Sequence, residues 1–178
     1  GQKVKSLKEM IFNFKEIIYK KLKCGPIKKI SSDFRFIPIT YYNKPFIVQS
    51  PLLFLAYGLL ENMDYKKTYI KMKFPRLLND KQFAFKKFLI DLEKYIKDHK
   101  YEKIFRKLRW NLQNKEFRSS LNPSQTLFTC QLLETSTIYN ENNKPINKKH
   151  LLVNSRIKSI CILTGLWIHK NSLGFLWS

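Results

Sequence analysis

The stretch from residue 34 to residue 49, FRFIPITYYNKPFIVQ, constrains the fold more than any other part of this chain. Aromatic and β-branched residues stand on both sides of Asn43-Lys44, which is the pattern of two strands joined by a tight turn. Pro38 lies inside the first run, where a proline indicates an edge strand or a bulge. The polar segment Gln49-Ser50-Pro51 ends the second run. The stretch therefore predicts an antiparallel β-hairpin.

Further strand patterns follow along the chain. In residues 68–74, TYIKMKF, side chains of two kinds alternate strictly, as they do on the two faces of a strand. The apolar face consists of Ile70, Met72 and Phe74, and the other face of Tyr69, Lys71 and Lys73. Residues 125–133 predict another strand, and residues 156–177 predict a closing hairpin with its turn near residues 171–174. The polar, Asn-rich segment 135–150 predicts a mobile loop.

Apolar residues recur at helical spacing in three other segments. Residues 6–23 begin with a capping box from Ser6 to Glu9 and stop at Gly25-Pro26. A second helix is expected over residues 80–98, with Asp80 as its N-cap. A third is expected over residues 101–112, and its outward face carries Lys103, Arg106, Lys107 and Trp110.

These patterns predict an α+β fold with five or more antiparallel strands and helices between the third and the fourth strand. The chain has 178 residues, which is typical of one domain, and its 44% of hydrophobic residues can form a core. We expect residues 1–30 to form an N-terminal helical extension and residues 31–178 to form a single domain.

The charge points to the class of partner. The chain has 34 Lys+Arg against 13 Asp+Glu, a net charge of +21. Such a surplus favours a polyanionic partner, first nucleic acid and second an anionic membrane surface. The alternative is compositional bias of an AT-rich genome. No apolar run approaches the roughly 20 residues that span a bilayer, and the N-terminus does not resemble a secretory signal, so we expect no membrane partner.

Metal and cofactor chemistry leave no pattern in the sequence. The cysteines are few, odd in number and far apart, and the histidines are scattered: Cys24, Cys130, Cys161, His99, His150 and His169. This arrangement predicts no metal site and favours reduced, buried thiols in an intracellular protein. No phosphate-binding loop or dinucleotide fingerprint is present, so we expect no cofactor.

Catalysis leaves little trace either, because the chain contains no nucleophile-elbow or metalloprotease motif. A two-metal nuclease would need converging carboxylates. Such carboxylates are in principle available at Asp64, Asp80, Asp91, Glu93 and Asp98. The last three stand among helical lysines and are expected to be solvated charges, so the sequence predicts a protein that is not an enzyme.

Binding of a single-stranded nucleic acid needs cations along the phosphates and flat side chains under the bases. Four places in the sequence combine the two, and core packing is the alternative for each aromatic residue. The predicted nucleic-acid-binding residues are Tyr42, Lys44, Tyr69, Lys71, Lys73, Lys103, Arg106, Lys107, Trp110, Trp167, His169 and Lys170.

The order IPITYYNKPFIVQSP, followed by PLLFLAYG and the closing LTGLWIHKNSLGFLW, also carries a family pattern. It resembles the single-stranded DNA-binding proteins of nucleocytoplasmic large DNA viruses, which are similar to the single-stranded DNA-binding protein of phage T7. The resemblance implies an OB-fold-like antiparallel β-barrel. It also implies single-stranded DNA binding in viral DNA replication, recombination or repair, in the viral factory of the host cytoplasm or in the nucleus.

Replication or repair proteins are the further partners that this resemblance implies. Such proteins usually end in an acidic tail, and the sequence ends at Ser178 without one. Either a tail was removed or the protein differs from the family. The runner-up function is a structural or scaffolding component, such as a virion protein or an RNA-binding subunit of a large assembly. A choice between DNA and RNA and the oligomeric state stay open.

Overall fold

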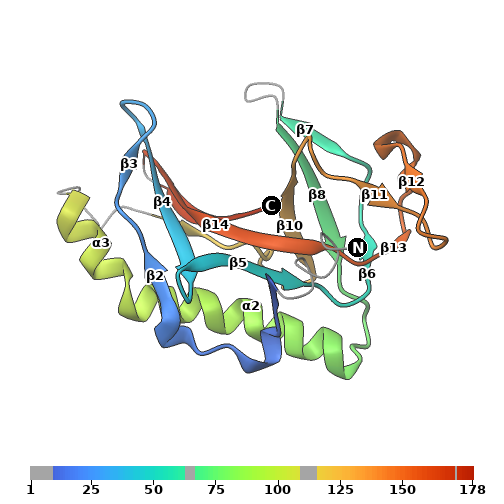
Figure 1. Ribbon diagram of the computed structural model, residues 1–178, viewed down its shortest axis with the longest axis horizontal. Helices are drawn as coiled ribbons and strands as arrows, with labels where there is room; N and C mark the ends of the chain where they lie inside the picture. The colour runs from blue at the N-terminus through green and yellow to red at the C-terminus, as the bar shows by residue number, and fades with distance from the viewer. Residues whose placement is uncertain (1–9, 63–66, 109–115, 171) are drawn as a thin grey trace.

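The computed structural model describes residues 10–62, 67–108, 116–170 and 172–178, and shows two sheets beside one main helix (Figure 1). The eight-stranded sheet consists of β1 (Ile11–Phe12), β2 (Leu22–Cys24), β3 (Lys28–Lys29), β4 (Phe34–Tyr41), β5 (Lys44–Gln49), β14 (Ile160–His169), β15 (Ser172–Trp177) and β9 (Glu116–Arg118). The five-stranded sheet consists of β6 (Leu53–Leu55), β7 (Leu60–Asn62), β8 (Lys67–Lys73), β10 (Leu127–Leu132) and β13 (Arg156–Ile157).

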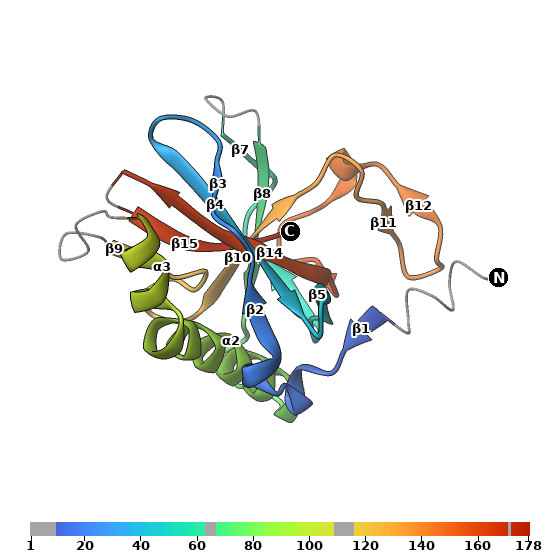
Figure 2. The same cartoon turned by 60° about the vertical axis from the view of Figure 1, so that its left-hand side comes forward.

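The remaining elements are helical, apart from one short hairpin. The helices are α2 (Asp80–His99) and α3 (Tyr101–Leu108), and the 3₁₀ turns are η1 (Phe14–Glu16), η2 (Tyr19–Lys21) and η4 (Lys148–His150). The hairpin pairs β11 (Ile138–Tyr139) with β12 (Pro145–Ile146) and stands away from both sheets (Figure 2). It lies within the segment for which the sequence predicts only a loop.

The fold is therefore mixed α+β, as expected, and the helices α2 and α3 lie between β8 and β10 in the chain. Most of the strand pairs are antiparallel, although β1 and β9 join the larger sheet as parallel strands. In the described part of the chain, the two sheets do not close into a barrel. The OB-fold-like barrel that the resemblance implies is therefore not confirmed.

The hairpin at the start of the sequence argument forms as β4 and β5. Its turn consists of Tyr42 and Asn43, with φ of 50° and 61°, because Tyr41 pairs with Lys44. Two central residues with positive φ are the mark of a type I′ turn, whose twist matches that of the strands. The turn lies one residue earlier than the sequence predicts. Pro38 lies opposite Gly165, beside a bulge in β14. A bulge was one of the two alternatives that the sequence predicted at this proline.

The helix α2 connects the cores of the two sheets and lies beneath them in Figure 1. The ring of Phe88 lies 6.0 Å from that of Phe46 in β5 and 6.3 Å from that of Trp177 in β15. On the other side, Phe85 lies 5.7 Å from Phe128 in β10. These aromatic side chains are at most 3% exposed, so α2 buries one face against both sheets.

Local capping sets the start of α2. The N-cap is Asn79, not Asp80: its side chain accepts a hydrogen bond from the backbone of Gln82, whose side chain accepts one from the backbone of Asn79. This is a complete capping box. The third helix is confirmed as α3 as far as Leu108, and residues 109–112 of that prediction lie outside the described part.

The N-terminal helix predicted over residues 6–23 is wrong over residues 11–23. Residues 11–24 instead form β1, η1, η2 and β2, and of these β1 pairs with β5 and β2 pairs with β4. Phe12 packs 4.7 Å from the ring of Tyr41, and Phe14 packs 5.2 Å from that of Phe85. Contacts with distant residues therefore outweigh the local helical spacing. The predicted capping box at residues 6–9 lies outside the described part.

Glu93 is buried, at 7% exposed, and is not the solvated charge that the sequence predicts. Its carboxylate accepts hydrogen bonds from the Ser119 hydroxyl at 2.7 Å and 2.9 Å, and from the backbone and hydroxyl of Ser120 at 3.0 Å. A buried carboxylate needs such donors. Glu93 therefore connects α2 to the segment that precedes β10.

Candidate nucleic-acid interface

A row of aromatic side chains crosses the eight-stranded sheet where β4 pairs with β14. Phe36 lies directly opposite Trp167, and Phe34 lies opposite His169, with 6.1 Å between the ring centroids of that second pair. We call these four residues the aromatic row. Residues that are paired across two strands share a face of the sheet. The row therefore belongs to one face.

The burial pattern identifies that face. Ile37 and Ile168, which alternate with members of the row, are fully buried in the core, so their neighbours point to the opposite side. The side chains of the row are half-buried and lie outside the hydrophobic core cluster. The row thus occupies the outer face of the sheet, away from the core.

A β-bulge sets the orientation of Trp167 and His169. The pairing of β14 with β15 shifts between Leu163 and Gly165, and the buried side changes from Cys161 and Leu163 to Leu166 and Ile168. A bulge adds one residue to a strand and reverses the alternation beyond it. Without this bulge, Trp167 and His169 would point into the core.

Two glycines make room for the rings of the row. A Cβ atom at Gly165 would lie 2.6 Å from Cζ of Phe36, and a Cβ atom at Gly174 would lie 2.9 Å from Cζ2 of Trp167. The rings therefore lie against backbone that carries no side chain. The ring of Phe36 therefore lies close to the backbone of β14, and the ring of Trp167 lies close to that of β15.

Cations border the aromatic row on the edge side and at the turn. On the edge, the exposed Lys28 in β3 pairs with Phe36 of β4 and therefore shares the face of the row, whereas its exposed neighbour Lys29 pairs with Arg35 and belongs to the other face. At the turn between β14 and β15, Lys170 is exposed, and its backbone N–H donates to Asp33 at 3.2 Å. If the bases of a nucleic-acid strand stacked on the row, its phosphates would lie near the charges of Lys28 and Lys170.

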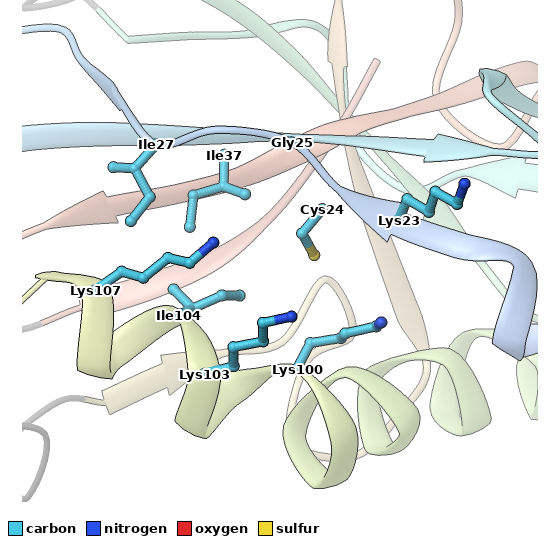
Figure 3. A pocket seen from close by; sticks show the side chains of 9 residues that line it. All are labelled: Lys23, Cys24, Gly25, Ile27, Ile37, Lys100, Lys103, Ile104 and Lys107. Atoms are coloured by element: carbon cyan, nitrogen blue, oxygen red, sulfur yellow. The ribbon is translucent and has the colours of Figure 1, made fainter.

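A second basic surface is a pocket between β2 and the corner where α2 meets α3 (Figure 3). We call it the lysine pocket, and its volume is about 220 Å³. Its lining residues are Lys23, Cys24, Gly25, Ile27, Ile37, Lys100, Lys103, Ile104 and Lys107. Figure 3 shows the lysines of the helical corner reaching toward β2, and the Cys24 thiol pointing into the space between.

The electrostatics of the pocket are visible at Cys24. Burial raises the pKa of this half-buried thiol above its usual value, and the positive charges of three pocket lysines partly oppose that rise. Among the described residues, the lining contains no Asp or Glu. The pocket is therefore a place of concentrated positive charge with an apolar floor.

The aromatic row and the lysine pocket lie on opposite faces of β4. Ile37 lines the pocket, whereas its neighbour Phe36 belongs to the row. Both surfaces adjoin the edge formed by β2 and β3, along which Lys23, Lys28 and Lys29 follow one another (Figure 1). Lysines of one edge segment therefore connect the two surfaces.

The structure brings some of the predicted site residues together. Lys103 and Lys107 meet in the lysine pocket, and Trp167, His169 and Lys170 meet at the aromatic row. It leaves others apart. Arg106 forms an exposed ion pair of 2.8 Å with Glu102, and Trp110 lies outside the described residues.

The other predicted residues occupy two separate places. Tyr42 is 44% exposed at the β4–β5 turn, with Nζ of Lys21 5.6 Å from its ring centroid and an exposed Lys44 two residues on. The face assignment for β8 is confirmed, because Ile70, Met72 and Phe74 are buried, whereas Tyr69 and Lys71 are half-buried and Lys73 is exposed. That strip lies in the five-stranded sheet, apart from the aromatic row.

Sequence reasoning missed Phe34 and Phe36 in the row, and Lys23 and Lys100 in the pocket. The alternation of the two phenylalanines with Ile37 was a signal that could have found them. No local signal joins Lys23 to Lys100, because they meet only when β2 packs beside the helical corner.

No protein-family model, curated protein or solved structure matches this chain. Among the described residues, no three His, Cys, Asp or Glu side chains gather where they could hold a metal ion. None of the described helices combines the length and the apolar character that crossing a membrane requires.

Proposed function

We propose that this protein binds single-stranded nucleic acid without catalysing a reaction, with single-stranded DNA as its ligand. The observation that carries this proposal is the aromatic row, in which Phe34, Phe36, Trp167 and His169 share the outer face of a sheet beside exposed lysines. Aromatic side chains on a sheet are a recurrent way to stack unpaired bases. The net charge of +21 supplies the attraction for phosphates.

The proposal includes the role that the resemblance implies, in viral DNA replication, recombination or repair, with replication or repair proteins as further partners. It also includes an OB-fold-like arrangement of the strands. In support, β14 bends at its bulge and pairs with β5 through its first half and with β4 through its second half. Bulged, bent strands of this kind are found at the corners of barrels.

The first prediction tests the row. Phe36→Leu and Trp167→Leu keep apolar bulk and remove the ring, so each should weaken oligo-dT binding by about 1–3 kcal/mol in fluorescence anisotropy. The matched control is Tyr139→Leu, which removes a 59% exposed ring from the β11–β12 hairpin and should leave the affinity unchanged. Thermal melts identify any loss of folded protein. Unchanged binding by both row variants, or tighter binding of duplex than of oligo-dT, would overturn the proposal.

A structural or scaffolding role is the second candidate, and two exposed apolar side chains favour it. Leu77 is 88% exposed and lies in the segment that precedes α2, and Phe83 is 61% exposed and lies near the start of α2. Exposed large apolar side chains of this kind can mark a protein contact. In that case, Leu77→Ser with Phe83→Ser would abolish assembly with a protein partner, and row variants would have no effect.

A further inference from the structure

The lysine pocket holds more positive charge than is needed to neutralise one internal phosphate of a nucleic-acid strand. Four lysine side chains, those of Lys23, Lys100, Lys103 and Lys107, contribute to the lining of one cavity. Within the described part of the chain, none of the four forms an ion pair. Like charges held close together repel one another, and a bound anion relieves that repulsion.

The charge and the size of the cavity narrow the choice of anion. An internal phosphodiester carries one negative charge, whereas a phosphomonoester carries about −1.5 to −2 at neutral pH, which suits four lysines better. The volume of about 220 Å³ is smaller than the roughly 300–1,000 Å³ of pockets for drug-sized ligands. It fits a phosphate with part of its sugar. Ile27 and Ile104 offer the apolar surface that sugar carbon atoms require.

We propose that the lysine pocket binds a phosphomonoester group, with the phosphate on the lysines and the adjoining sugar against the isoleucines. Two sources share this chemistry: the terminal phosphate of a nucleic-acid strand, and a free nucleotide. The first source rests on the proposed function, because it makes the pocket an end-binding site beside the aromatic row. The second source does not depend on strand binding.

Cys24 provides a reporter inside the pocket. Its thiol lines the cavity and is half-buried, whereas Cys130 and Cys161 are 4% and 1% exposed and serve as slow internal references. A bound phosphate blocks the approach to the thiol. It also cancels the positive charges that oppose the rise of the Cys24 pKa, which lowers the fraction of reactive thiolate. Both effects slow alkylation.

The first experiment measures alkylation of Cys24 by iodoacetamide, followed by mass spectrometry at constant ionic strength. We expect thymidine monophosphate at ten times its dissociation constant to slow the reaction about tenfold, since only the free fraction reacts. Thymidine, which lacks the phosphate, should not slow it. Equal protection by thymidine, or no saturable protection by the nucleotide, would overturn the proposal.

Paired variants assign the effect to the pocket. Lys103→Gln with Lys107→Gln should abolish the protection by the nucleotide. The control is Lys87→Gln with Lys94→Gln, which removes the same charge from exposed positions of α2 outside the pocket and should retain full protection. Equal loss of protection in both double variants would show that the protection depends only on the net charge. The proposal of a phosphate site in the lysine pocket would then be wrong.

The second experiment separates the two sources. Anisotropy compares oligo-dT carrying a 5′-phosphate, a 3′-phosphate or hydroxyl groups at both ends. A gain of about tenfold from one terminal phosphate, lost in Lys103→Gln with Lys107→Gln, identifies strand-end binding. If the nucleotide protects Cys24 from alkylation but a terminal phosphate gives no gain in affinity, the ligand of the pocket is the free nucleotide. If neither appears while Phe36→Leu still weakens oligo-dT binding, this inference fails and the proposed function stands.

Discussion

At Gly165, two strands approach so closely that no side chain fits. A Cβ atom there would lie 2.1 Å from the carbonyl oxygen of Ile37 and 2.6 Å from the ring of Phe36. Gly165 also borders the bulge that turns Trp167 outward. The absence of a side chain at Gly165 therefore permits both the close pairing of β4 with β14 and the position of the Phe36 ring in the aromatic row.

The prediction at this position concerns stability. Gly165→Ala should lower the free energy of unfolding by about 1–3 kcal/mol, because backbone atoms must shift to admit the methyl group. Gly58→Ala is the matched control, since a Cβ atom at Gly58 meets nothing within 4 Å. Denaturant unfolding of both variants provides the comparison. A Gly165→Ala protein as stable as the control would contradict the close approach.

Tyr19 carries a pH prediction. Burial, followed by the negative charge of Asp91 and the neighbouring Tyr41, raises the pKa of Tyr19 from 10.0 to about 12. A folded-state pKa that is raised above the unfolded value stabilises the protein below pH 10, and this contribution is lost as the pH rises through 12. Tyr19→Phe should therefore lose less stability between pH 10 and pH 12 than the parent protein. Parallel slopes in urea unfolding would show that Tyr19 titrates normally.

Among the helices and strands, local sequence patterns were enough to predict those elements whose stabilising contacts lie close together in the sequence. The β4–β5 hairpin has its turn residues and both strands within residues 34–49, and α2 combines a capping box with a continuous apolar stripe. The segment from Ile11 to Cys24 differs. Its apolar spacing also suits a helix, but the open edges of β4 and β5 are formed by residues far along the chain. Only the assembled sheet decides between the two.

The candidate site was predictable to a similar degree. Trp167, His169 and Lys170 follow from the composition of the last hairpin, but their orientation depends on a bulge in β14. Pro38 indicated a bulge only as one of two alternatives, and in its own strand β4. Phe36 becomes part of the site only through its register with Trp167. The lysine pocket needs the packing of α3 beside β2, and spacing along the chain does not encode that packing.

For the whole molecule, the net charge of +21 has two separable consequences. The charges repel one another in the folded state, and added salt screens that repulsion. A bound polyanion removes the repulsion as well, and in addition stabilises the folded protein by mass action. The first effect requires only charge, whereas the second requires a binding surface such as the aromatic row.

Thermal melts at constant ionic strength distinguish these effects. Oligo-dT at one hundred times its dissociation constant should stabilise the folded protein by about 2.7 kcal/mol and raise Tm. In direct titrations, log K should fall with log salt, with a slope of about −0.7 for each phosphate neutralised. Duplex DNA with the same number of phosphates, added at the same concentration, serves as the control and should raise Tm less, because its bases cannot stack on Phe36 and Trp167. An equal rise with duplex would mean that the charge alone attracts the ligand, and the aromatic row would then have no part in binding.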